Sequence, residues 1–303
     1  MAVERVAASL SLRHFLLALA VVAVWGTNFV VIRVALDDLP PLLFATLRFT
    51  FALLPAVFFI KRPAVPWRDL AAYGVLIGAG QFGLLYLAMN GHASPGIASL
   101  VMQTQVFFTI GLSMALSGER LRGDQWLALA LAVGGLGVIL AHTDGSTTPL
   151  GLGLLLLAAL SWAGGNLVVR RSVGADMLAY VVWAALFSIP PLLALSFIFE
   201  GPAAMLSGLQ RADAATWAAV GWQSVGNTLF GFACWGFLLS RYPAATIAPM
   251  ALLVPVFGMA AAALLLHEPL PGWKLLAAGL VIGGLALNLF APRLRKPKAP
   301  PAA

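Results

Sequence analysis

Charged residues and cysteines are scarce in this chain, and each scarcity excludes a class of protein. Only 10% of the 303 residues are charged, whereas a soluble domain carries about 25%. Because 61% of the residues are hydrophobic and the mean hydropathy is +0.95, the protein must face lipid, which excludes the soluble enzymes. The one cysteine, Cys234, excludes a disulfide framework and a cysteine zinc site.

Catalytic and coupling motifs are also missing. The sequence has no HExxH, GxSxG or Walker loop, so we expect no enzyme, no ATP-driven pump, no cofactor and no metal. Residues 78–83 have the GxGxxG spacing of a dinucleotide fingerprint, but no strand precedes them. No Asp or Glu lies in the middle of an apolar stretch. Proton-driven carriers usually bury a titratable relay, so this absence favours facilitated diffusion or exchange over proton antiport.

Ten apolar stretches are long enough to cross a membrane, since a spanning helix needs about 20 mostly apolar residues. They cover residues 14–36, 41–60, 70–90, 95–117, 124–141, 150–170, 177–199, 214–240, 243–266 and 271–291. The first stretch is too long for the apolar part of a cleavable signal, and we expect it to be retained. The sequence thus predicts an all-α polytopic membrane protein with a cytoplasmic N-terminus at 1–13 and a basic, disordered cytoplasmic tail at 292–303.

Lys and Arg residues predict the orientation, because cytoplasmic loops are rich in them. With the N-terminus inside and ten crossings, the cytoplasmic side holds most of these residues, among them Lys61, Arg170 and the basic tail. The outer side holds Arg33, Arg211 and Lys274. We therefore expect both termini in the cytoplasm.

The two halves of the chain share a pattern of residues at a nearly constant spacing. The matching pairs include Gly78 with Gly226, Phe82 with Phe230, Pro95 with Pro243, and Glu119 with Glu268. Residues 14–141 and 150–291 are therefore predicted to be two repeats of five spans each. An odd number of spans inverts the second repeat. Inverted repeats are typical of secondary transporters, with the substrate site near the membrane midplane between the halves.

Several motifs resemble one protein family. They are Trp25–Val30 (WGTNFV), Leu42–Phe49 (LLFATLRF), Gly118–Leu121 (GERL), Pro255–Phe257 (PVF) and His267–Leu270 (HEPL). Together they resemble the ten-span EamA-type exporters of the drug/metabolite transporter superfamily, over residues 12–291. The resemblance implies ten helices around a central cavity and export of amino acids or related metabolites. Exporters of aromatic and other neutral amino acids are the most similar.

The chain departs from that family in span 4. There Gln105 takes the place of a proline that span 9 keeps as Pro255. We therefore expect the two halves to bend differently, because proline removes a backbone hydrogen bond within a helix.

Two related polar stretches, which begin at Trp25 and Trp162, supply the first candidate site residues. Asn28 and Asn166 lie within them. An amide side chain that faced lipid would lack hydrogen-bond partners, so these two are expected to face the interior. These amides are expected either to bind a zwitterionic substrate or to hydrogen-bond neighbouring helices. Each tryptophan precedes its asparagine by three or four residues, so the two lie close on one helix face. We interpret the tryptophans as cavity walls, with packing or interfacial roles as the alternative.

Arg48 is the only basic residue deep within a span. An intramembrane charge is a functional hypothesis by default, and Arg48 is placed to meet a substrate carboxylate. The alternative is a structural arginine that binds helix-end carbonyls or pairs with Asp37 or Asp38. The sequence leaves both open.

Further polar and aromatic residues in spans 3, 4, 7 and 8 complete the candidate substrate site. They are Gln81, Tyr86, Met102, Gln105, Trp183, Gln223 and Asn227. Each of them can be a satisfied packing contact, but together the amides outnumber the deep charges. Polar residues in such number predict that part of the interior meets a water-filled path.

Two other sets of residues are predicted to be structural. Glu119 and Glu268 lie at span ends, and we expect them to bond to backbone or to a nearby cation rather than to carry protons. Glycines at GxxxG spacing, Gly74 with Gly78 and Gly279 with Gly283, predict close packing of helices.

The leading hypothesis is a monomeric exporter in the bacterial inner membrane for neutral, largely apolar or aromatic amino acids, working by alternating access. A transporter of phosphorylated sugars from the same superfamily is the nearest alternative, but it needs several deep cations, and only Arg48 is available. A membrane scaffold or an intramembrane enzyme is the alternative from another class. The expected partners are a small-molecule substrate and the lipid bilayer, and not nucleic acid, despite the net charge of +7.

Overall fold

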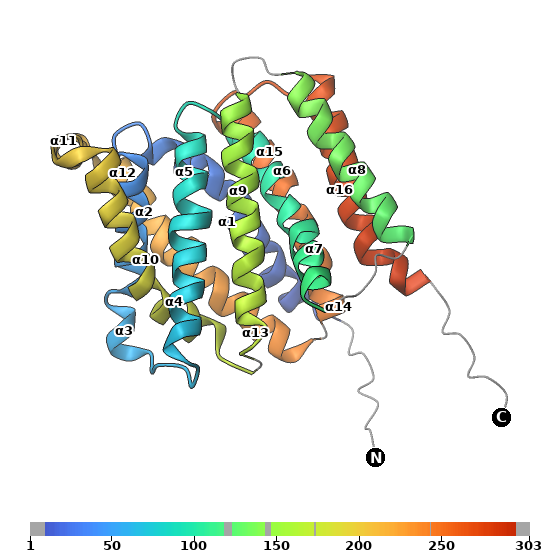
Figure 1. Cartoon of the computed structure of the whole chain (residues 1–303), viewed down its shortest axis with the longest axis horizontal. Helices are drawn as coiled ribbons and strands as arrows, with labels where there is room; N and C mark the ends of the chain where they lie inside the picture. The colour runs from blue at the N-terminus through green and yellow to red at the C-terminus, as the bar shows by residue number, and fades with distance from the viewer. Residues whose placement is uncertain (1–9, 118–122, 143–146, 173, 243, 295–303) are drawn as a thin grey trace.

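The computed structural model describes residues 10–117, 123–142, 147–172, 174–242 and 244–294, and every regular element in these ranges is a helix. The helices stand side by side in one bundle (Figure 1), and along the chain they group into ten spans. This confirms the prediction of an all-α membrane protein with ten spans.

Five of the ten spans are single helices. These are α1 (Leu12–Ala35), α8 (Gly123–Ala141), α9 (Pro149–Val169), α10 (Met177–Phe199) and α16 (Gly272–Leu294). The other five spans are composite. Span 2 is α2 (Pro41–Leu53) with α3 (Ala56–Phe59), span 3 is α4 (Trp67–Val75), η1 (Leu76–Gly83) and α5 (Leu84–Met89), and span 4 is α6 (Pro95–Val101), η2 (Met102–Thr104) and α7 (Gln105–Ser117). Span 8 is α12 (Ala214–Gly221), η3 (Trp222–Phe230) and α13 (Gly231–Arg241), and span 9 is α14 (Ala244–Ile247), η4 (Ala248–Leu252) and α15 (Leu253–Leu265).

Span 8 differs from the others in composition. Within the described residues, nine helical segments are long and apolar enough to cross a membrane by themselves, and span 8 is not among them. Its helices nevertheless follow one another without a break from Ala214 to Arg241. Gln223 and Asn227 lower the hydropathy of this span, which is tolerated where a span is enclosed by other helices.

Two segments differ from the prediction. Helix α16 continues to Leu294, so the first residues of the tail predicted to be disordered are helical. The rest of that tail, like residues 1–9, lies outside the described residues. Helix α11 (Gly201–Arg211) occupies a segment predicted to be a connection, and it lies across one end of the bundle (Figure 1). Arg211 fixes its end by donating a hydrogen bond to the carbonyl of Asp38 at 3.0 Å.

The helix contacts repeat between the two halves. Span 1 packs against spans 9 and 8, and its counterpart, span 6, packs against spans 4 and 3. Spans 2 and 7 pack on each other, and so do spans 5 and 10, which lie together at one edge of the bundle (Figure 1). Each contact of one half thus has its equivalent in the other, as two inverted five-helix repeats require.

Departures from α-helical geometry also come in matching pairs. Spans 3 and 8 contain the π-helical segments η1 and η3, and spans 4 and 9 contain the 3₁₀ segments η2 and η4. Span 4 therefore leaves α-helical geometry without a proline. The segment in span 9 is longer, five residues against three, and contains Pro249. Because π segments are rare and concentrate at functional sites, spans 3 and 8 direct attention to the interior.

Close helix contacts depend on one of the two predicted glycine pairs. A Cβ atom on Gly74 would collide with the carbonyl oxygen of Ala184, and one on Gly78 would collide with Ser188. The prediction is therefore confirmed for this pair, which allows spans 3 and 7 to touch. It is wrong for Gly279 and Gly283, where a Cβ atom would meet nothing within 4 Å. These two glycines do not face a helix.

At one end of the bundle, Glu268 links span 4 to the start of span 10. Its carboxylate accepts hydrogen bonds from Ser94 at 2.5 Å and from the backbone N–H of Gly96 at 3.1 Å, at the beginning of α6. It also pairs with the ammonium of Lys274 at 3.0 Å, and both side chains are buried. Glu268 is thus bonded to backbone and to a cation, as predicted. Glu119, its counterpart, lies outside the described residues.

Glu200 forms a similar link at the same end. Its carboxylate accepts hydrogen bonds from the backbone N–H groups of Leu42 at 2.6 Å and Leu43 at 3.0 Å, at the start of α2. A carboxylate at a helix N-terminus satisfies free N–H groups and favours the helix dipole. Carboxylates from the second half therefore bind the starts of two helices of the first half.

The glycine contacts give a matched pair of variants. We expect Gly74→Ala to destabilise the protein by about 2 kcal/mol, because the new methyl group pushes α4 away from α10. Gly279→Ala should leave stability unchanged or raise it by about 0.5 kcal/mol, since alanine favours a helix and meets nothing there. Thermal unfolding in detergent measures both. Equal losses in the two variants would contradict the packing described.

The buried ion pair gives a second test. We expect Glu268→Gln to cost about 3 kcal/mol, because it leaves the ammonium of Lys274 buried without its counter-charge. Asp37→Asn at the same end breaks the exposed pair with Arg33 and should cost under about 1 kcal/mol. The double variant Glu268→Gln, Lys274→Met should recover part of the first loss in thermal unfolding. An absence of recovery would show that the two side chains are not coupled.

Candidate functional site

Arg48 is the centre of a buried polar cluster between spans 2, 3 and 8. Its side chain is 1% exposed. The guanidinium donates hydrogen bonds to the hydroxyl of Tyr86 at 3.0 Å and to Oγ1 of Thr228 at 3.2 Å. It also lies over the ring of Phe82, 3.5 Å from the centroid. A π face and two hydroxyls stabilise the cation only in part, because none of them carries a negative charge.

The structure removes one alternative for Arg48. Asp37 pairs with Arg33, and Asp38 accepts a hydrogen bond from Thr216 at 2.6 Å, so neither aspartate reaches Arg48. Among the described residues no carboxylate forms an ion pair with Arg48, and its Nε has no hydrogen-bond partner. A buried arginine without a counter-charge is electrostatically costly. The site therefore favours a negatively charged group beside Arg48.

Span 8 adds two amides to the cluster. Gln223 is fully buried, and within the described residues neither Nε2 nor Oε1 of its side chain has a partner. Its backbone carbonyl accepts a hydrogen bond from Thr228 at 2.9 Å, which connects it to Arg48. Asn227 is 5% exposed on the same π segment. Buried polar groups are almost always satisfied, so the unpaired amide of Gln223 requires a ligand or water.

Span 1 packs against span 8. Trp25 donates from Nε1 to the backbone carbonyl of Asn227 at 3.2 Å, and its ring packs against Trp235 at 5.1 Å between centroids. Gly231 is required beside it, because a Cβ atom there would collide with the indole. Asn28 lies one turn further along α1, is 4% exposed, and has no partner for Oδ1 among the described residues. The wall formed by spans 1 and 8 is thus aromatic with unsatisfied amides.

An aromatic wall borders Arg48 as well. Tyr86 stacks on Phe44 with 4.7 Å between ring centroids, and Phe82 lies 6.0 Å from Tyr86 in an edge contact. Phe49 extends the group at 5.8 Å from Phe82. A cation within such rings suits a ligand that has a carboxylate and an apolar or aromatic side chain.

Asn166 and Gln105 form a second polar group between spans 6 and 4. The amide of Asn166 donates to Oε1 of Gln105 at 2.8 Å and to Oγ1 of Thr109 at 3.4 Å. Both amide side chains are half-buried. Trp162 is also half-buried and packs against the main hydrophobic core. Here the amides do act as interhelical hydrogen bonds, while their partial exposure leaves them able to contact a ligand.

Of the three remaining predicted site residues, two lie inside the bundle and one lies at its end. Gln81 and Met102 are buried, at 6% and 2% exposure, in η1 and η2. Trp183 lies near the beginning of α10, donates from Nε1 to the carbonyl of Ile60 at 2.9 Å, and packs edge-on against Trp67. It is therefore bound to the connection between spans 2 and 3 at one end of the bundle, and not to the Arg48 cluster.

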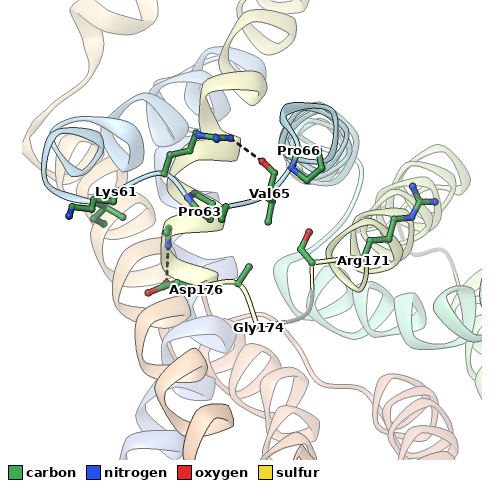
Figure 2. Close-up of a pocket in the computed structure, with 13 residues that line it drawn as sticks. Lys61, Pro63, Val65, Pro66, Arg171, Gly174 and Asp176 are labelled. Atoms are coloured by element: carbon green, nitrogen blue, oxygen red, sulfur yellow. Dashed lines mark hydrogen bonds between the residues drawn. The ribbon is translucent and has the colours of Figure 1, made fainter.

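The described pockets lie at the two ends of the bundle. The larger, of about 620 Å³, is lined by residues 60–66 from one half and by Arg171, Ser172, Gly174, Ala175, Asp176 and Ala179 from the other. Figure 2 shows the two loops facing each other across it, with Lys61 and Arg171 pointing away from one another. A pocket of about 430 Å³ at the opposite end contains Arg33, Asp37 and Asn90. Neither pocket is lined by Arg48, Gln223 or Asn166.

Sequence reasoning missed two residues that hold Arg48. Thr228 accepts from its guanidinium, and Ser224 donates to its backbone carbonyl at 3.0 Å. Both follow Gln223 in one polar run, Gln223–Thr228, and that run was the available signal. The π geometry that turns these side chains toward span 2 has no comparable signature in the sequence.

Comparison with known proteins agrees with the architecture. The model of the EamA-like transporter family matches residues 12–141 and again residues 149–290. A protein of known crystal structure aligns over 94% of this chain and 99% of its own, with a TM-score of 0.62 and 20% identity, which shows a shared fold.

Similar sequences come from bacteria. A "probable amino-acid metabolite efflux pump" of Escherichia coli K12 is 43% identical over 95% of this chain and 98% of its own length. A protein of Salmonella typhimurium with the same description is 42% identical over 92% and 96%. An uncharacterized transporter of Bacillus subtilis, YoaV, is 27% identical over 92% and 97%. With its ten spans and matches over both halves, this chain belongs to the EamA-like transporter family.

Proposed function

We propose that this protein exports neutral, largely apolar or aromatic amino acids across the bacterial inner membrane. The observation that carries the proposal is Arg48, a buried cation that lacks a counter-charge among the described residues. An amino acid supplies the missing carboxylate. The names of the two most similar relatives cited above, probable amino-acid metabolite efflux pumps, support the same substrate class.

The remaining groups of the cluster suit the rest of such a ligand. The unpaired amide oxygens of Gln223 and Asn28 accept hydrogen bonds from an ammonium group. The rings of Phe44, Phe82 and Tyr86 provide an apolar surface for the side chain. With one deep arginine the site suits a single carboxylate better than a phosphate, which favours amino acids over phosphorylated sugars.

Transport follows from alternating exposure of this site by the two inverted halves. The described carboxylates Glu200 and Glu268 are engaged at helix starts near one end of the bundle and are not free to relay protons through its middle. We therefore propose facilitated diffusion or exchange, with the end that holds Arg62, Arg170 and Arg241 facing the cytoplasm.

The first experiment measures transport directly. Purified protein in liposomes should take up labelled phenylalanine, tryptophan and leucine, at rates that do not depend on an imposed proton gradient. Trp162→Ala and Asn166→Ala should each lower the initial rate about tenfold while leaving folded yield intact, which corresponds to about 1.4 kcal/mol. No uptake of any amino acid would overturn the proposed function. Strict dependence on the gradient would overturn the mechanism of facilitated diffusion alone.

The second experiment tests Arg48. Inhibition of uptake by an amino acid should exceed inhibition by its carboxamide, and Arg48→Gln should abolish this preference and raise the KM at least about tenfold. Thr228→Val removes a hydrogen-bond acceptor of the Arg48 guanidinium but leaves its positive charge in place. This variant should therefore keep the preference for the amino acid over its carboxamide. If Arg48 has only a structural role, both variants lose stability and the preference for the carboxylate survives in Arg48→Gln.

A further inference from the structure

A row of polar side chains runs along the contact between α7 and α9. We call it the α7–α9 seam: Gln105, Thr109 and Ser113 on α7, and Asn166 and Arg170 at the end of span 6. The residues of each helix are four apart, so they share one face. Besides the bonds of Asn166, Arg170 donates to Oγ of Ser113 at 3.0 Å. The row extends from the middle of the membrane to the end of the bundle where Arg170 lies.

The seam is partly exposed. Gln105, Ser113 and Asn166 are half-buried and Arg170 is exposed, whereas Thr109 between them is buried, at 7% exposure. Polar side chains do not face hydrocarbon when an internal position is available to them, so their partial exposure indicates contact with water rather than with lipid. Helices α7 and α9 stand next to each other in the bundle, with α8 and α16 to one side (Figure 1).

The equivalent contact in the other half, between α1 and α15, has opposite properties. The spacing that relates Gly78 to Gly226 relates Ser113 to Ala261, which is 7% exposed and belongs to an apolar cluster with Val30 and Ala262. A Cβ atom on Gly26 would lie 2.5 Å from Cβ of Phe257, so the helices touch. This contact is apolar and tightly packed, and it lies toward the other end of the bundle.

We propose that the α7–α9 seam is the water-lined path by which an amino acid passes between the basic end of the protein and the central site. Arg170 is the group that first binds the carboxylate, because its guanidinium is exposed at the mouth of the path. Asn166 and Gln105 receive the ligand deeper in the membrane. This assignment rests on the proposed function, and the tight α1–α15 contact keeps the opposite side closed in this conformation.

Cysteine accessibility tests the path without depending on transport. Cys234 is the only native cysteine, so Cys234→Ala gives a background free of thiols. Gln105→Cys and Ser113→Cys are then introduced singly, with Ala261→Cys as the matched control from the sealed contact. Membrane-impermeant thiol reagents are added to one face of oriented vesicles or to the other. Two positions along the seam keep the test decisive if one variant fails to fold.

We expect both seam cysteines to react from the basic face, and to react more slowly when phenylalanine is present. The Ala261→Cys variant should react at least about tenfold more slowly. With Ser113→Cys an anionic reagent should react about threefold faster than a cationic one, and adding Arg170→Gln should remove this difference, because the arginine concentrates anions at the mouth.

The outcomes of this experiment test the path and the proposed amino-acid transport separately. Unreactive seam cysteines in a protein that still transports amino acids would overturn the path and leave the proposed function standing. Reactive seam cysteines that no amino acid protects, in a protein without amino-acid transport, would support the path and overturn the substrate class. Reaction of Ala261→Cys as fast as the seam cysteines would overturn the distinction between the two contacts.

Discussion

Every polar group within the hydrocarbon must find its partner inside the protein, and the arrangement of this bundle depends on that constraint. Hydroxyl side chains bond the π segments and their surroundings to neighbouring helices. Ser161 donates to the carbonyl of Leu76 in η1, Ser188 to that of Gly74 just before η1, and Ser224 of η3 to that of Arg48, all within 3.0 Å. These bonds join spans 3 and 8 to spans 6, 7 and 2, so the irregular segments are held in place by the helices that pack on them.

Several buried groups have no hydrogen-bond partner among the described residues. On spans 1, 2 and 8 these are Nε of Arg48 and amide atoms of Asn28 and Gln223, and the hydroxyls of Thr147, Ser172 and Tyr180 are unpaired elsewhere in the bundle. Such groups are costly in an apolar interior unless a ligand or water completes them. A cation, amide oxygens and aromatic rings are complementary to a zwitterion with an apolar side chain, which is the physical basis of the amino-acid hypothesis.

The two halves share their helix contacts and their irregular segments, but they differ where transport requires a difference. The α1–α15 contact relies on Gly26 and on apolar residues, whereas the α7–α9 seam relies on amides, hydroxyls and Arg170. At the end beyond the tight contact, Glu200 and Glu268 bind helix starts. The proposed path requires this difference, because one side must be closed while the other admits water.

The sequence by itself determined the membrane class, the ten spans, the repeat and the isolated charge at Arg48. Hydropathy and residue spacing are local properties, and a lipid environment forces each long apolar stretch to become a helix. The same reasoning identified Glu268 as a boundary residue, because its position after a long apolar run needs no knowledge of its partners.

Only the tertiary structure decided which of several equivalent residues matter. Gly74 and Gly279 have the same sequence context, yet only Gly74 faces another helix. Trp183 resembles in the sequence the tryptophans predicted to line a cavity, but its indole donates a hydrogen bond to the carbonyl of Ile60 in the connection between spans 2 and 3. The sequence left open a pairing of Arg48 with Asp37 or Asp38, but these carboxylates bond to Arg33 and Thr216 instead. Partner choice and π geometry depend on contacts between helices far apart in the chain, and no local pattern of residues encodes them.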